Sequence, residues 1–122
     1  MQQGLMFPKA KEKKKRIHHP KSILHSKESK TCYLCMMLHG DNRKHRSLQE
    51  HHIFDGPNRI HSEEYGLKVY LCIPHHLNGF GPEAVHGNME IMRLLHQKGQ
   101  QAFEEKCGSR KQFIETFGRN YL

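Results

Sequence analysis

Two adjacent histidines, His51 and His52, lie between two groups of residues that could bind a metal. These groups follow Cys-x-x-Cys and Cys-x-x-His-His spacings: Cys32 and Cys35 before the pair, and Cys72, His75 and His76 after it. Neighbouring side chains of a regular strand point to opposite faces, so the two histidines are expected to have different roles. One could hold a metal while the other accepts a proton. Chance pairing is the alternative, because the chain contains 12 histidines.

The cysteine spacing predicts a structural metal site. Three thiolates and one imidazole from two distant stretches form the tetrahedral donor set typical of structural zinc: Cys32, Cys35, Cys72 and His75. Such a closed set leaves no position for a substrate, and its binding energy contributes directly to folding. Cys107 is left over near an expected helix end, where we expect it to pack or to be exposed.

The remaining histidines predict a second, open metal site. His51, His76 and His86 could hold one divalent ion and leave coordination positions free. His52 would then take a proton from water. Phosphodiester hydrolysis needs these parts, namely a base with a pKa near neutral and a metal that stabilises the leaving oxygen. The alternative is that His76 and His86 cap helices or face solvent.

Length and composition favour one small domain. The chain has 122 residues, of which only 35% are hydrophobic, so a structural metal would usefully supplement a small core. No apolar run is long enough to span a membrane, and the N-terminus lacks the apolar segment of a signal peptide. With the metal-type cysteine spacing, these features predict a protein of the reducing cytoplasm that has no membrane partner.

The net charge of +8 indicates a polyanionic partner such as DNA. We expect residues 1–30 to form a flexible basic arm ahead of a single domain at residues 31–122. The arm's candidate DNA contacts are Lys13, Lys14, Lys15 and Arg16. Arg43 and Arg59 are candidates within the domain, because contacts with phosphates release counterions. A localisation signal would also explain the arm, and simple solvation explains Arg43 equally well.

The pattern of elements predicts an α+β fold. Strands are expected at residues 48–54 and 67–71, separated by a turn and by one helical turn that Ser62 caps and Gly66 ends. A long helix should start after the cap Asn88 and run from Met89 to about Lys106. A capping box at Ser109-x-x-Gln112 should begin a final short helix, ended by Gly118. The buried stripe of this last helix is expected to be Phe113, Ile114 and Phe117.

The order of these pieces resembles that of the HNH nucleases, also called His-Me finger nucleases. The resemblance covers roughly residues 32–90 and rests on Cys32-x-x-Cys35, Glu50-His51-His52-Ile53 and Leu71-Cys72-x-x-His75-His76. It implies a ββα-metal core, in which two strands and a helix hold one divalent ion, joined to a zinc knuckle. It further implies that His51 and His76 bind the catalytic ion, that His52 is the general base, and that His75 replaces the knuckle's usual last cysteine.

The resemblance has one departure and several open points. The family's middle Asn would fall at about Leu67, which leaves the orientation of His52 in doubt unless Asn58 takes over. The catalytic ion could be Mg²⁺, Mn²⁺ or Zn²⁺, and the oligomeric state is undetermined. The small size and basic arm resemble compact phage-borne members, including a type that cuts DNA held by a recombinase filament. The main alternative is a non-catalytic, zinc-stabilised nucleic-acid-binding module. The catalytic interpretation requires His52 to point at the ion held by His51 and His76.

Overall fold

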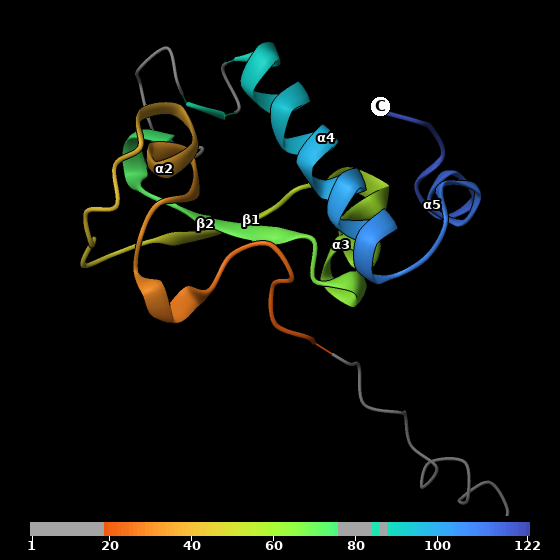
Figure 1. Ribbon diagram of the computed structural model, residues 1–122, viewed down its shortest axis with the longest axis horizontal. Coiled ribbons are helices and arrows are strands. Elements are labelled where there is room, and N and C mark those ends of the chain that lie inside the picture. Colours follow the sequence, from red (N-terminus) through yellow and green to blue (C-terminus); the bar gives the residue numbers. More distant parts are fainter. Residues whose placement is uncertain (1–18, 76–83, 86–87) are drawn as a thin grey trace, which may run out of the picture.

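The computed structural model describes residues 19–75, 84–85 and 88–122 (Figure 1). Its helices and strands combine into a mixed α+β fold, as predicted. In chain order they are α2 (Tyr33–His39), β1 (Gln49–His52), α3 (Arg59–Tyr65), β2 (Lys68–Leu71), α4 (Met89–Lys106) and α5 (Arg110–Phe117). Six predicted site residues lie outside the described residues: Lys13, Lys14, Lys15, Arg16, His76 and His86.

The two strands form an antiparallel pair in which His51 lies opposite Val69 and His52 opposite Lys68. Both predicted strands are confirmed, although β1 is shorter than expected at both ends and β2 starts one residue later. Because side chains alternate along a strand, His51 and Val69 share one face and His52 and Lys68 share the other. Figure 1 shows α2 and α4 on one side of the sheet and residues 19–30 on the other.

Residues 22–25 lie along the outer edge of β2. The Ile23 backbone N–H donates to the Gly66 carbonyl at 3.0 Å, and the Tyr70 N–H donates to His25 Nδ1 at 3.1 Å. Burial lowers the pKa of His25, which keeps the ring neutral so that Nδ1 can accept this bond. These contacts cover an edge that would otherwise expose unpaired backbone groups. Residues 22–25, which belong to the stretch expected to form the arm, are therefore in contact with β2.

The helix caps of the C-terminal half match the sequence. The Asn88 side chain accepts from two backbone N–H groups in the first turn of α4, and Ser109 forms a capping box with Gln112 at the start of α5. Phe113 and Phe117 are buried as predicted. Ile114 is 37% exposed, so its assignment to the buried stripe was wrong. A helix this short turns only one narrow face toward the core, and the phenylalanines at i and i+4 occupy it.

Helix α3 begins earlier than predicted, at Arg59, because the Gly56–Asn58 turn leads directly into it. Ser62 therefore lies inside the helix and does not cap it. Its hydroxyl oxygen instead accepts from the Phe54 N–H at 2.9 Å, which joins α3 to the end of β1. Gly66 ends the helix as predicted, with a positive φ of 69° that favours glycine.

Gly99 marks the closest approach of α4 to the chain just after β1. A Cβ atom at this position would lie 2.9 Å from side-chain carbons of both Ile53 and Phe54. Gly99→Ala is therefore expected to lower the free energy of unfolding by about 1–3 kcal/mol through overpacking, although alanine is the better helix former. Urea unfolding followed by circular dichroism measures this loss. Gln101→Ala, on an exposed position of α4, should change stability little, and a stabilised Gly99→Ala variant would contradict the packing.

Candidate metal centre and histidine pair

Four ligand atoms from two distant stretches meet between α2 and the end of β2. They belong to Cys32, Cys35, Cys72 and His75, and all lie within 4.8 Å of one another, so this cluster could hold a metal ion. Cys32 is the N-cap of α2, and one helical turn brings Cys35 back beside it. After β2 the chain turns tightly at Ile73–His75, where the His75 N–H donates to the Cys72 carbonyl at 3.0 Å. The predicted grouping is confirmed, and its first half is the start of a helix.

The distances within this cluster match a tetrahedron. Metal–sulfur bonds of about 2.3 Å and metal–nitrogen bonds of about 2.0–2.1 Å give edges of roughly 3.8 Å between sulfurs and roughly 3.6 Å between sulfur and nitrogen. The Cys35 and Cys72 sulfurs are 3.8 Å apart. His75 Nδ1 lies 3.4, 3.5 and 3.3 Å from the sulfurs of Cys32, Cys35 and Cys72. The donor set is therefore preorganised for one tetrahedral ion.

The backbone around Cys32 favours its thiolate form. Burial acts to raise the pKa of this thiol, but hydrogen bonds from backbone N–H groups of Cys72 and Cys35 outweigh burial and lower the pKa. The N–H of Cys35 lies 3.4 Å from the Cys32 sulfur at the start of α2. A thiolate is the form that binds a metal, so the helix start prepares one ligand before any ion arrives.

The two histidines of β1 point to opposite faces of the sheet. His51 is 6% exposed and lies on the face of Val69, which carries α2 and α4. The His52 side chain is 9% exposed and lies against α3, with Nε2 2.6 Å from Glu63 Oε1. The alternation of faces was predicted. The assignment of His52 as a base beside an ion held by His51 and His76 stays a prediction, because His76 lies outside the described residues.

His52 belongs instead to a compact charged network. Glu63 Oε2 accepts from Lys68 Nζ at 3.0 Å and lies 2.9 Å from His19 Nδ1. Lys68 Nζ also lies 3.3 Å from Glu50. The donor atoms of Glu50, His52 and Glu63 are close enough to surround an ion, but the Lys68 ammonium is already paired with both carboxylates. Sequence analysis missed Glu63 and Lys68, although a lysine within an apolar strand was a signal for a buried ion pair.

The charge of Glu63 is strongly stabilised in this network. Burial by itself would raise the pKa of Glu63, but hydrogen bonds from His52, Lys68 and His19 outweigh it and lower the pKa to about 2. Such a carboxyl stabilises the fold at a pH above its ordinary pKa of 4.5. This contribution is lost as the pH falls from about 4.5 toward about 2.

Glu63→Gln is therefore expected to lower the free energy of unfolding at neutral pH. The difference from wild type should shrink as the pH falls below about 4.5, because the wild-type carboxyl then becomes protonated as well. Urea unfolding at a series of pH values measures this difference. Both proteins keep the cysteine cluster, so any loss of its metal in acid should affect wild type and Glu63→Gln equally. Glu64→Gln, at an exposed neighbouring position, should have little effect. A difference that stayed constant in acid would contradict the network.

The other predicted site residues are dispersed. Arg43 is exposed and lies 3.7 Å from Asp41, and Arg59 is exposed at the start of α3. Leu67 is fully buried in the core. The Asn58 side chain donates to the Phe117 carbonyl at 3.0 Å, so it holds α5 and is not available to orient His52. None of these four residues belongs to the cysteine cluster or to the group of Glu50, His52 and Glu63.

Comparison with protein-family models, with curated proteins and with solved structures found no significant match. Among the helices formed by the described residues, none combines the length and apolarity that crossing a membrane requires.

Proposed function

We propose that this protein is a zinc-stabilised, metal-dependent endonuclease that cuts DNA. The observation that carries the proposal is the position of His51, buried on the sheet face that also carries α4. The chain between His75 and Asn88 joins the cysteine cluster to the first turn of α4 and includes His76 and His86. Two antiparallel strands, a cysteine-histidine corner and a following helix are the pieces that the resemblance to HNH nucleases implies.

The proposal gives the reacting role on β1 to His51 instead of His52. A neutral imidazole nitrogen can accept a proton, so His51 could take the proton of an attacking water. His76 and His86 would hold the divalent ion, which supplies electrostatic stabilisation to the phosphate and the leaving oxygen. His52 acts as a positioning residue, because its bond to Glu63 fixes β1 against α3.

Zinc is the proposed ion of the cysteine cluster. The soft thiolate donors and the tetrahedral edges suit Zn²⁺, and a set of four protein ligands leaves no open position. The site therefore serves the fold and not the reaction. Retaining free thiolates fits a reducing compartment such as the cytoplasm. The net charge of +8 supports DNA as the partner, and presentation of that DNA by a recombinase filament is part of the same proposal.

Binding of Mn²⁺ to zinc-loaded protein tests the ion site independently of cleavage. Electron paramagnetic resonance should detect one bound Mn²⁺ per chain in wild type and in His51→Gln. His86→Gln should lose this ion while it keeps its zinc and its fold. If zinc-loaded wild type binds no Mn²⁺, the proposed catalytic ion does not exist.

A non-catalytic nucleic-acid-binding module is the second candidate, because Nε2 of His52 is engaged by Glu63 at 2.6 Å and the His52 side chain is only 9% exposed. In that case the cysteine cluster and the positive charge would be the functional features, and the histidines of β1 would be structural. Salt-sensitive DNA binding without any cleavage would favour this candidate.

A further inference from the structure

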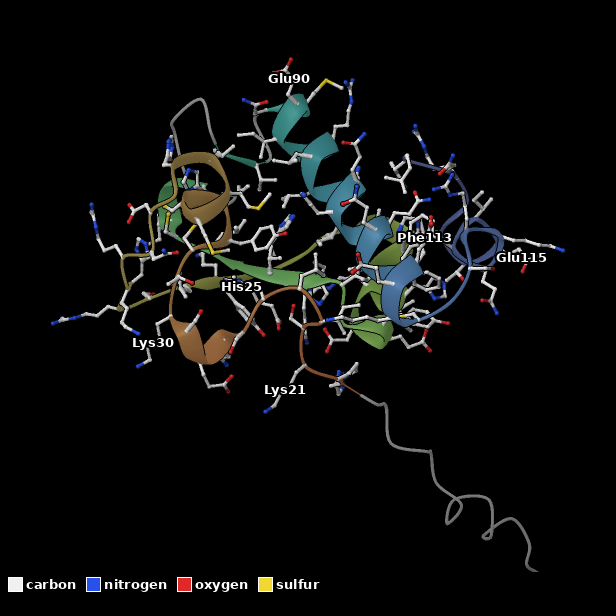
Figure 2. All side chains as sticks on the ribbon, viewed as in Figure 1. Lys21, His25, Lys30, Glu90, Phe113 and Glu115 are labelled. Carbon is white, nitrogen blue, oxygen red and sulfur yellow. The ribbon has the colours of Figure 1, made fainter. Side chains whose placement is uncertain are left out.

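A basic pocket lies beside Tyr70, next to the N-terminal segment. Its volume is about 290 Å³, and its lining includes Lys27, Lys30, His45, Arg46 and Tyr70. A second hollow of about 370 Å³ shares Lys27 and Tyr70 with the first. The second hollow extends the basic surface to Lys21, and Figure 2 shows Lys21 and Lys30 on the side of the molecule away from α4.

Two stretches that are distant in the sequence build this pocket. The loop before β1 is fixed to the N-terminal segment by a β-bridge between Thr31 and Lys44 and by the His45 N–H, which donates to the Lys30 carbonyl at 2.8 Å. The pocket's cations are therefore held close together by backbone contacts. Within the described parts of the chain, neither Lys27, Lys30 nor Arg46 forms an ion pair with a carboxylate.

Two further observations indicate a ligand with acceptor oxygens. His45 Nε2 is buried and has no hydrogen-bond partner among the described residues, which is costly for a polar atom. Lys30 has a φ of 60°, the one positive value at a non-glycine residue in the described segments. Glycine would adopt this backbone conformation without strain, so a lysine at this position carries a local cost. A function for its ammonium group in the pocket explains that choice.

We propose that this pocket binds a backbone phosphate of the nucleic acid. Phosphate oxygens accept hydrogen bonds from ammonium, guanidinium and imidazole N–H groups, which are the groups that line the pocket. Two carboxylates lie nearby. Glu50 is already paired with Lys68, and Glu28 lines the second hollow together with Lys21 and Lys27, so the three cations around the first pocket are not matched by a carboxylate in its own lining. This inference rests on the proposed function for the identity of the polymer, and it adds where the DNA strand crosses the surface.

Fluorescence anisotropy of a labelled DNA duplex, with zinc-loaded full-length protein and no added catalytic ion, tests the pocket. Lys27→Gln and Arg46→Gln should each weaken binding roughly five- to tenfold at about 0.1 M salt. Each should also reduce the slope of log affinity against log salt concentration by about 0.9, the value for one lost phosphate contact. Lys111→Gln removes the same charge from an exposed position of α5 and is the matched control.

Lys30→Gly separates binding from folding. Glycine relieves the strained backbone, so the melting temperature should stay the same or rise while DNA affinity falls. Pocket variants that bind DNA no more weakly than Lys111→Gln would overturn the inference and leave the nuclease proposal intact. Conversely, DNA that is bound through the pocket but never cleaved would contradict the nuclease proposal alone.

Discussion

Replacing Cys72 with serine is expected to unfold the domain at physiological temperature. Cys72 joins the end of β2 to α2 through the cluster, and its side chain is almost fully buried. Structural zinc supplies an apparent free energy of about 10–16 kcal/mol in small zinc domains, comparable to the entire stability of an ordinary domain, about 5–15 kcal/mol. A serine hydroxyl is a poor zinc ligand. Without the Cys72 thiolate, the thiols of Cys32 and Cys35 would lose the ion that they share.

Zinc content and thermal unfolding together measure this effect. Wild type should carry one zinc per chain and lose its cooperative unfolding transition when a strong chelator removes the metal, with recovery on adding Zn²⁺. Cys72→Ser should contain no stoichiometric zinc and should show no transition. Cys107→Ser is the matched control, because Cys107 is exposed and lies outside the cluster. A zinc-free Cys72→Ser protein that melts at the wild-type temperature would contradict the structural role.

His51→Gln is expected to reduce DNA cleavage by about 10²–10⁴-fold, the usual contribution of a general base. Glutamine approximates the size of the ring and keeps a polar group on the buried face, so the fold and the zinc content should be retained. His52→Gln should behave differently. The substitution removes one partner of Glu63, His52, and should lower the free energy of unfolding. The molecules that remain folded should keep most of the cleavage rate.

Single-turnover cleavage of a supercoiled plasmid compares these two variants, with each rate corrected for the folded fraction from circular dichroism. Equal losses of rate in His51→Gln and His52→Gln, with both proteins fully folded, would contradict the division of roles between the two faces. A loss confined to His52→Gln would restore the base assignment that the resemblance implies.

The cysteine cluster could be predicted from the sequence because the two ligands of each pair lie close together in the chain. Pairs of ligands three positions apart are brought together by one turn of chain, at Cys32 and Cys35 in a helix start and at Cys72 and His75 in a tight turn. Only the meeting of the two pairs is a long-range event, and the donor types indicate that the two pairs could share one ion. Donor type and spacing were therefore sufficient to predict the cluster.

The environment of His52 could not be predicted in the same way. Strand alternation places His51 and His52 on opposite faces, but it does not say which face meets the helix between the strands. That outcome depends on α3 beginning at Arg59 and presenting Glu63 to β1, whereas the sequence favoured a shorter helix capped by Ser62. The start of α3 four residues earlier than predicted therefore determines which side chain meets His52.

The N-terminal segment was misassigned for a related reason. Residues 22–25 have no periodic apolar pattern and follow a run of lysines, so they read as part of a solvated arm. Their contacts are backbone hydrogen bonds and a histidine ring that accepts from Tyr70, 45 positions along the chain. Edge pairing of this kind depends on backbone groups, which every residue has, and it leaves little trace in residue types.

The most direct test of the account is plasmid cleavage by zinc-loaded wild-type protein with added Mg²⁺ or Mn²⁺. The account predicts metal-dependent conversion of supercoiled DNA to nicked or linear product, which stops when the added ion is removed while zinc is retained. The products should carry 5′-phosphate and 3′-hydroxyl ends, as expected when the 3′ oxygen is the leaving group. Tight, salt-sensitive DNA binding with no cleavage under any of these ions would contradict the nuclease and favour the binding module.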